Sequence, residues 1–356
     1  MAVDRRDREP VPHRIVLLGF GNVAREFARL LAERRQELLR DWGLDVRVMA
    51  ILTANHGRVE ARGGIDLRRA LRASAAGRTL EALGRPIRVD SKEYVRKSRA
   101  DTVIELTPLR IVPVQPAVDH IVAALASGKH VITANKGPVV YHYRRLRDLA
   151  RRNRVGFRYE GTVMDGAPVF NLLQETLVGA RVLSFRGVLN SVTNFVLSRL
   201  EEGGTYEEGV ADARRMGLLE ADPSMDLDGW DATVKACLLA NVVMGGRVRP
   251  EAVPRQGIAG TDAARVRAAS AAGRRVKQVA RGSREGRSVR VSVSLEELPP
   301  DDALHAIRGT SNALLVRTDL IPELLVSERN PGVRQTAYAV YSDLLAIHEG
   351  RLIPGR

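Results

Sequence analysis

The sequence predicts an α/β protein of two domains, and three observations lead to this prediction. The chain has 356 residues, which is enough for about two domains. In its first part, short apolar runs alternate with segments of helical periodicity, as in a parallel sheet covered by helices. From about residue 157 the pattern changes, and 288–295 (SVRVSVSL) alternates strictly, as a half-exposed strand does.

The first apolar run leads into a glycine-rich turn. Ile15 to Leu18 reads as a buried strand, GFGNVA follows directly, and Phe27, Leu30 and Leu31 continue at helical spacing. In such a strand–turn–helix unit the first glycine allows the tight turn, and the second lets the backbone approach a pyrophosphate. We therefore predict a Rossmann-type dinucleotide site whose contacts include Gly19, Gly21, Asn22 and Val23.

The end of the second predicted strand, 46–52 (VRVMAIL), bears on the choice of cofactor. An acid that selects NAD normally stands at this position, but Thr53 to Arg58 (TANHGR) contains no carboxylate. Arg58 and His56 could instead meet a 2'-phosphate. The sequence favours NADP, with NAD as the open alternative.

Two further strands end in residues suited to binding. The run 101–107 (DTVIELT) ends at Thr107, and 129–133 (KHVIT) is followed by Asn135 and Lys136. Ligands of open α/β sheets bind beyond the carboxyl ends of the strands. We therefore expect Thr107 and Lys136 at the cofactor edge. The alternative for Lys136 is an ordinary turn lysine before Gly-Pro.

The most unusual stretch, 217–239 (GLLEADPSMDLDGWDATVKACLL), places an acid-rich segment before a helix. We expect Asp226 or Asp228 to cap that helix. Within it, Asp231 and Lys235 are four residues apart and lie on the shoulder of an apolar face. A carboxylate and an ammonium at the edge of a core suit proton transfer. The alternative is an ordinary surface ion pair, which is common and weak.

Lysine usage sharpens this interpretation. Of the 56 basic residues only six are Lys, and the rest are Arg, which does not lose its proton near neutral pH. A lysine that persists against this bias is more often required chemically. Lys136 and Lys235 are the two in motif-like surroundings.

Composition narrows the class of protein. Apolar residues make up 44% and charged residues 28%, as in soluble globular proteins. The net charge of +14 comes from scattered arginines with only 4% aromatics, which argues against nucleic-acid binding. The single cysteine, Cys237, permits no internal disulfide and fits a reducing cytoplasm. The first residues, 1–14, contain no apolar run of the kind found in a signal peptide, and no stretch reaches membrane-spanning length.

The second half of the chain gives fewer clear elements. Strands are expected at 157–163, 180–189, 288–295 and 314–318, and helices at 117–127, through Phe170 to Leu177, after Asn190, and at 336–347. We place the nucleotide-binding domain at 13–140, completed by about 330–350, and a substrate and dimerisation domain at 141–329.

Several blocks in this order resemble the homoserine dehydrogenase family over nearly the whole chain. They are the glycine turn, VIELTP at 103–108, HIVAALASGKHVITANKGP at 120–138, EGTVMDGAPV at 160–169, GVLNSVTNF at 187–195 and EADPSMDLDGWDATVK at 220–235. This family interconverts L-homoserine and L-aspartate 4-semialdehyde with NAD(P)(H), in threonine and methionine biosynthesis. The resemblance implies a homodimer with catalytic Lys136, Lys235 and Asp231.

The resemblance also implies further sites. Glu220, Asp226 and Thr193 would hold the substrate, and a monovalent cation, Na⁺ or K⁺, would bind at the positions of Glu160, Val163, Asp165 and Ala167. Asp165 stands where the family has a small residue, and 190–193 (NSVT) and 329–333 (RNPGV) also depart from the family pattern. Since only seven residues follow Glu349, we expect no ACT or aspartate kinase domain and no threonine regulation through one.

Two other functions fit parts of the pattern. One is an NADP-dependent dehydrogenase of a different amino-acid semialdehyde, and the other is a catalytically silent NADP-binding regulator. The set of Glu220, Asp226, Asp231, Lys235 and Lys136 argues against a silent protein.

Overall fold

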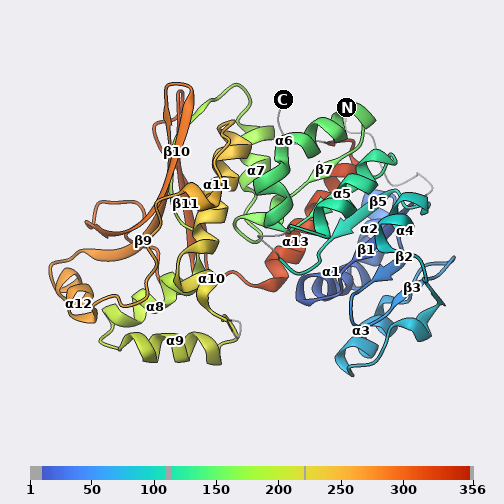
Figure 1. Ribbon diagram of the computed structural model, residues 1–356, viewed down its shortest axis with the longest axis horizontal. Helices are drawn as coiled ribbons and strands as arrows, with labels where there is room; N and C mark the ends of the chain where they lie inside the picture. The colour runs from blue at the N-terminus through green and yellow to red at the C-terminus, as the bar shows by residue number, and fades with distance from the viewer. Residues whose placement is uncertain (1–9, 110–113, 220–221, 353–356) are drawn as a thin grey trace. The chain divides into compact units, whose positions relative to one another are not determined.

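The computed structural model describes residues 10–109, 114–219 and 222–352, and these form two compact units (Figure 1). The first unit contains the chain up to Gly166 together with the residues from Val333 onward. The second contains Ala167–Gly332. The chain thus leaves the first unit, builds the second, and returns. The sequence placed the division earlier, at 140, which falls inside helix α6 (Lys136–Asn153).

The first unit is built on a seven-stranded sheet of order β4-β3-β2-β1-β5-β6-β7. Strands β1, β2, β5, β6 and β7 run parallel, while β3 pairs antiparallel with β2 and β4. Their bounds are β1 Val11–Leu18, β2 Leu44–Leu52, β3 Arg58–Glu60, β4 Arg85–Pro86, β5 Thr102–Glu105, β6 His130–Thr133 and β7 Phe157–Arg158. The order reverses at β1, so the turn that follows it lies at the crevice where such sheets bind dinucleotides.

Helices cover this sheet, and the last helix of the chain is one of them. They are α1 Asn22–Glu33, α2 Arg35–Trp42, α3 Leu67–Ala75, α4 Ser91–Lys97, α5 Ala117–Ala126, α6 Lys136–Asn153 and α13 Val333–His348. Figure 1 shows α13, in red, beside α1, in blue. Val340, Tyr341 and Leu344 of α13 join Phe27 and Leu31 of α1 in one buried core. The C-terminal helix therefore completes the N-terminal unit, as the sequence predicted.

A buried ion pair also holds α13 to the sheet. Arg158 of β7 is fully buried, and its Nε lies 3.1 Å from Oδ1 of Asp343 on α13. The other oxygen of Asp343 accepts a hydrogen bond of 3.0 Å from the backbone N–H of Glu160. Arg158 also donates to the carbonyl of Arg351, at 3.3 Å. Because neither charge reaches water, each depends on the other.

The second unit is an antiparallel sheet of order β10-β9-β8-β11-β12 with helices against it. Helix α11 lies against β9 and β10 (Figure 1). The strands are β8 Val182–Val188, β9 Arg275–Glu285, β10 Ser288–Leu298, β11 Asn312–Thr318 and β12 Leu324–Glu328. The helices are α7 Val169–Asn171, α8 Ser191–Glu201, α9 Tyr206–Arg215, α10 Ser224–Leu227, α11 Trp230–Val243 and α12 Ala263–Ala271.

The predicted fold class is confirmed, but several local expectations are wrong. The strand expected at 157–163 ends at Arg158, and a 3₁₀ turn, η3 (Glu160–Thr162), follows. Neither Asp226 nor Asp228 caps α11; its N-cap is Gly229, with φ of 78°. Helix α11 is buried on nearly all sides rather than along one face, because β9 and β10 also pack against it.

No helix within the described part of the chain is both long enough and apolar enough to cross a bilayer.

Breaking the Arg158–Asp343 pair should destabilise the first unit. We expect Asp343→Asn to lower the free energy of unfolding by about 3–5 kcal/mol, because it leaves a buried guanidinium without its carboxylate. Denaturant unfolding of the two proteins would measure the difference. Asp148→Asn is the matched control, since Asp148 pairs with Arg147 while 47% exposed, and should cost less than about 1 kcal/mol. Equal losses in both variants would contradict this account.

Candidate active site

The glycine turn after β1 packs directly against the end of β5. Gly19 has φ of +91°, and a Cβ on it would lie 2.4 Å from the carbonyl oxygen of Leu106. Both facts require glycine here. Gly21 is the N-cap of α1, and a Cβ there would meet nothing within 4 Å. The backbone at Gly21, at the start of α1, is therefore not covered by other atoms, and binding of a pyrophosphate by this turn and by Asn22 and Val23 stays a prediction.

The ends of β5 and β6 are joined beside this turn. Asn135 caps α6 by accepting a hydrogen bond from the backbone N–H of Gly137, and its Nδ2 donates to the carbonyl of Thr107 at 3.4 Å. Lys136, half-buried, is the first residue of α6. Thr107 and Lys136 thus stand on the same edge of the sheet as Gly19.

Arg58 lies on the short strand β3, which the sequence pattern did not reveal. Its register partner is Leu52, the last residue of β2. Its guanidinium donates to the carbonyl of Val89 at 3.4 Å. His56 is exposed, and its backbone N–H donates to the hydroxyl of Thr53. A basic side chain therefore stands opposite the end of β2, where an acid would read the ribose of NAD.

In the second unit, the predicted Asp231–Lys235 pair is formed and buried. Lys235 Nζ lies 2.9 Å from Asp231 Oδ2, and each side chain is 11% exposed. Nζ also donates to the carbonyl of Leu189, at 2.7 Å. The interpretation as an ordinary surface pair is therefore wrong for this helix. The ammonium thus contacts a carboxylate and a carbonyl in a largely dry environment.

Asn190 links this pair to the acid-rich segment. Its Nδ2 donates to Asp231 Oδ2 at 3.0 Å and to Asp226 Oδ1 at 2.7 Å. Its Oδ1 accepts from the backbone N–H of Thr193 and so caps α8. One amide therefore orients two carboxylates and starts a helix. Sequence analysis did not nominate Asn190, although an Asn directly before a helical pattern is a cap signal.

Thr193 lies in the wall of the same cluster, and Glu220 lies outside the described residues. Thr193 is buried, and its hydroxyl is 3.2 Å from both the carbonyl of Asn190 and Oε1 of Gln278. Gln278, on β9, in turn donates to the carbonyl of Gln256 at 3.0 Å. Thr193 is thus fixed by neighbours on both sides.

The positions matched to a cation site offer oxygen donors. Glu160 is 2% exposed. The carboxylate of Asp165, whose backbone is left-handed with φ of 39°, accepts a 2.7 Å hydrogen bond from Thr336. Val163 is buried, and Ala167 begins the second unit. Carboxylate and carbonyl oxygens suit a hard cation. Across the described ranges, no group of three or more His, Cys, Asp or Glu side chains is placed to hold a metal ion.

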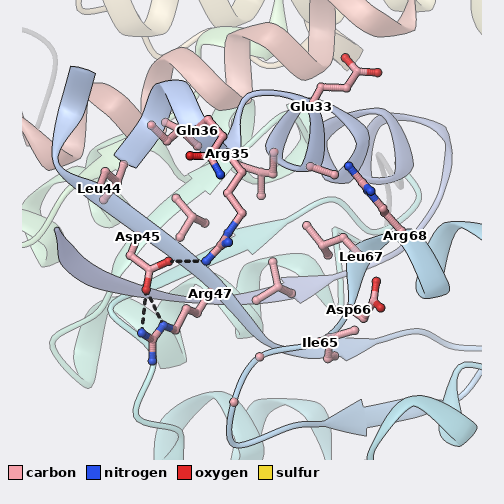
Figure 2. Close-up of a pocket in the computed structure, with 17 residues that line it drawn as sticks. Glu33, Arg35, Gln36, Leu44, Asp45, Arg47, Ile65, Asp66, Leu67 and Arg68 are labelled. Atoms are coloured by element: carbon pink, nitrogen blue, oxygen red, sulfur yellow. Dashed lines mark hydrogen bonds and ion pairs between the residues drawn. The ribbon is translucent and has the colours of Figure 1, made fainter. Parts of the chain in front are cut away.

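A separate cavity of about 840 Å³ lies at the opposite end of β2 (Figure 2). There Asp45 accepts from Arg35 at 3.4 Å and from Arg47 at 2.7 Å. The cavity is lined by residues at the amino-terminal end of the strand, whereas the glycine turn follows the carboxyl end of β1. This cavity is therefore not part of the dinucleotide edge.

Taken together, a parallel sheet with a glycine turn at its switch point and a buried carboxylate–ammonium pair define an NAD(P)-dependent dehydrogenase. The homoserine dehydrogenase NAD-binding domain model matches residues 19–160, and the homoserine dehydrogenase model matches 168–345. The chain belongs to the homoserine dehydrogenase family, which confirms the resemblance. It is an NAD(P)-dependent oxidoreductase that acts on a CH–OH group.

Individual relatives match along almost their whole length. The NAD(+)-dependent homoserine dehydrogenase of Pseudomonas canavaninivorans is 33% identical over 339 residues, covering 95% of this chain and 96% of that protein. The homoserine dehydrogenase of Methanocaldococcus jannaschii is 32% identical over 336 residues, covering 94% and 98%. A hyperthermophilic archaeal homoserine dehydrogenase solved with NADPH superposes with a TM-score of 0.80 at 30% identity, covering 95% and 98%.

Asn190→Ala should damage both the fold and the activity. We expect a loss of about 1 kcal/mol from the missing helix cap. We also expect kcat/KM for homoserine to fall roughly tenfold to a hundredfold, because Asp226 and Asp231 lose a shared donor. Unfolding curves and steady-state rates would measure the two effects.

Asp262→Ala is the matched control for this experiment. Asp262 caps α12 in the same unit by accepting from Ala264, at 2.8 Å, so it should lose similar stability while keeping its rate. An Asn190→Ala enzyme with undiminished kcat/KM would remove Asn190 from the site.

Proposed function

We propose that this enzyme interconverts L-homoserine and L-aspartate 4-semialdehyde, with Lys235 as the proton donor and acceptor at the reacting oxygen and Asp231 as its positioning partner. The observation that supports these roles is the buried pair itself. Nζ of Lys235 is held at 2.9 Å from Asp231 and at 2.7 Å from the carbonyl of Leu189. Two contacts from different elements fix where the ammonium stands.

The chemistry needs such a group. When bound, the dinucleotide supplies or accepts the hydride. As the semialdehyde is reduced, negative charge develops on its oxygen, and an ammonium held in place stabilises that charge and delivers a proton. In the oxidative direction the same lysine receives the hydroxyl proton. We assign a second catalytic ammonium to Lys136, at the start of α6.

The charges of the substrate indicate which side chains bind it. L-Homoserine carries an ammonium, which carboxylates recognise. We propose that Asp226 and Glu220 bind the polar groups of the substrate and that Thr193 lines the pocket. Support for Asp226 comes from its 2.7 Å hydrogen bond with Asn190, which joins it to the catalytic pair. The assignments of Glu220 and Thr193 rest on their matching positions in the family motif.

We further propose NADP as the preferred cofactor and a monovalent cation at Glu160, Val163, Asp165 and Ala167. The relatives differ in cofactor, since one is named NAD(+)-dependent and another was solved with NADPH. The position of Arg58 opposite Leu52 supports NADP here. For the cation, a higher melting temperature in KCl or NaCl than in choline chloride is expected, and equal values would exclude the site.

The family also suggests a setting for the enzyme. We propose a homodimer formed by the second unit, located in the cytoplasm and serving threonine and methionine biosynthesis. The single cysteine, Cys237, is buried, which fits a reducing compartment. Light scattering would test the dimer, and growth of a homoserine auxotroph carrying this chain would test the pathway.

Lys235→Ala should lose most of its turnover while remaining folded. We expect kcat with homoserine and NADP⁺ to fall by about 10²–10⁴, the range for a lost proton-transfer group. Lys136→Ala should behave similarly.

The control for Lys235→Ala is Lys97→Ala. Lys97 forms the same acid-to-lysine pair four residues apart, with Glu93 at 2.6 Å, but its side chain is 66% exposed. Its rate should not change. Near wild-type turnover in Lys235→Ala would exclude this mechanism.

Arg58→Ala should separate the two cofactors. Only NADP carries the extra phosphate, so its Kd should rise roughly tenfold while that of NAD stays the same. Fluorescence titration with NADPH and NADH would measure both. Arg85→Ala, in the adjacent strand β4 and 80% exposed, serves as the control. A parallel loss of both cofactors would show that Arg58 does not read the phosphate.

A further inference from the structure

A fully buried carboxylate, that of Glu105, ends strand β5. The side chain has no exposed surface. Its Oε1 accepts from both the backbone N–H of Thr107, at 3.1 Å, and the Thr107 hydroxyl. Its Oε2 lies 3.4 Å from the hydroxyl of Thr133 on β6. A buried acid is tolerated only when its oxygens are bonded in this way.

Two further side chains, those of His120 and Ser91, lie beside the Glu105 carboxylate. His120 of α5 is 3% exposed, and its Nδ1 lies 3.9 Å from Glu105 Oε1. At that distance it makes no hydrogen bond to Glu105, and it makes none to any other described residue. On the other side of the ring, Nε2 lies 2.8 Å from the hydroxyl of Ser91 at the start of α4. Ser91 and His120 thus join α4 to α5 next to the Glu105 carboxylate.

The short segment that Glu105 holds is the one on which the dinucleotide edge is assembled. Gly19 packs on it so closely that a Cβ would lie 2.4 Å from the oxygen of Leu106 and 3.0 Å from the nitrogen of Thr107. On its other side, the carbonyl of Thr107 accepts from Asn135, the N-cap of α6. The glycine turn and the N-cap of α6 therefore both contact the Leu106–Thr107 backbone.

We propose that Glu105 is a positioning residue for the cofactor: it fixes the Leu106–Thr107 backbone, and through it the glycine turn and the first turn of α6. This inference rests on the proposed role of that edge in dinucleotide binding. Glu105 itself touches neither cofactor nor substrate. Its effect should therefore appear in cofactor affinity and leave the KM for homoserine unchanged.

The decisive comparison uses two substitutions of similar size. Glu105→Met removes both acceptors and leaves the N–H and hydroxyl of Thr107 without their partner. Glu105→Gln keeps one acceptor oxygen for them. We expect the Kd of NADPH, from fluorescence titration, to rise at least tenfold in Glu105→Met, which is about 1.4 kcal/mol. In Glu105→Gln it should stay within about threefold.

Thr102→Val controls for the loss of a buried hydrogen bond. Thr102 begins the same strand, is fully buried, and bonds His13 at 2.7 Å at the end of β5 away from the glycine turn. The Thr102→Val variant should have a lower melting temperature but an unchanged Kd for NADPH. Should Glu105→Met fail to fold, Glu105→Asp replaces it, because a side chain one methylene shorter draws the carboxylate back from Thr107.

The outcomes are distinct. A raised Kd in Glu105→Met, or in its replacement, with an unchanged KM for homoserine supports the proposal. A wild-type Kd combined with a lowered melting temperature overturns it, because Glu105 would then serve stability alone. Since the Kd is measured without turnover, the result holds even if the catalytic assignment of Lys235 fails in its own assay.

Discussion

The pair between Arg158 and Asp343 is the contact on which the first unit depends. The sheet that carries the dinucleotide edge is assembled from residues near the start of the chain, yet the helix that fills its core comes from the end. Burying either the guanidinium or the carboxylate without its partner would be strongly destabilising, so the pair specifies how that helix docks. Since Asp343 also accepts from Glu160, the same contact sets the backbone after β7. Because Arg158 ends β7 and Glu160 follows it, this contact lies on the same edge of the sheet as the carboxyl ends of β1, β5 and β6.

In each unit, one buried polar side chain, here called a node, makes hydrogen bonds to several groups of the candidate site. Asn190 hydrogen-bonds two carboxylates and caps α8. The residue before it, Leu189, provides the carbonyl that accepts from Lys235. Glu105 joins the ends of two strands of the parallel sheet, β5 and β6. Each node is buried, so its hydrogen bonds are strong and directional, and leaving one unmade is costly. The reactive groups are positioned by these nodes rather than by long-range packing.

The sequence predicted those parts of the protein that local pattern encodes. The strand and glycine turn at 15–24 and the spacing of Asp231 and Lys235 were sufficient to place the cofactor edge and the buried pair. Strand β9 was missed because buried polar residues, Lys277 and Gln278, interrupt its apolar pattern, and their partners on α8 and at Gln256 are distant in sequence. The capping prediction for α11 failed because Asp226 and Asp228 belong to a separate short helix, α10, and its C-cap, and the left-handed Gly229 begins α11 instead. Glu105 passed unnoticed because a single acid within an apolar run gives no periodic signal.

The two crossings between the units lie beside each other within the first unit. Asp165 accepts from Thr336, and Gly166 is so close to Gln335 that a Cβ would lie 3.0 Å from the Cβ of that residue. The second unit is therefore an insertion whose entry and exit nearly coincide. Translation makes all of Ala167–Gly332 before it makes the last helix, α13, so the first unit stays incomplete while the whole second unit is synthesised.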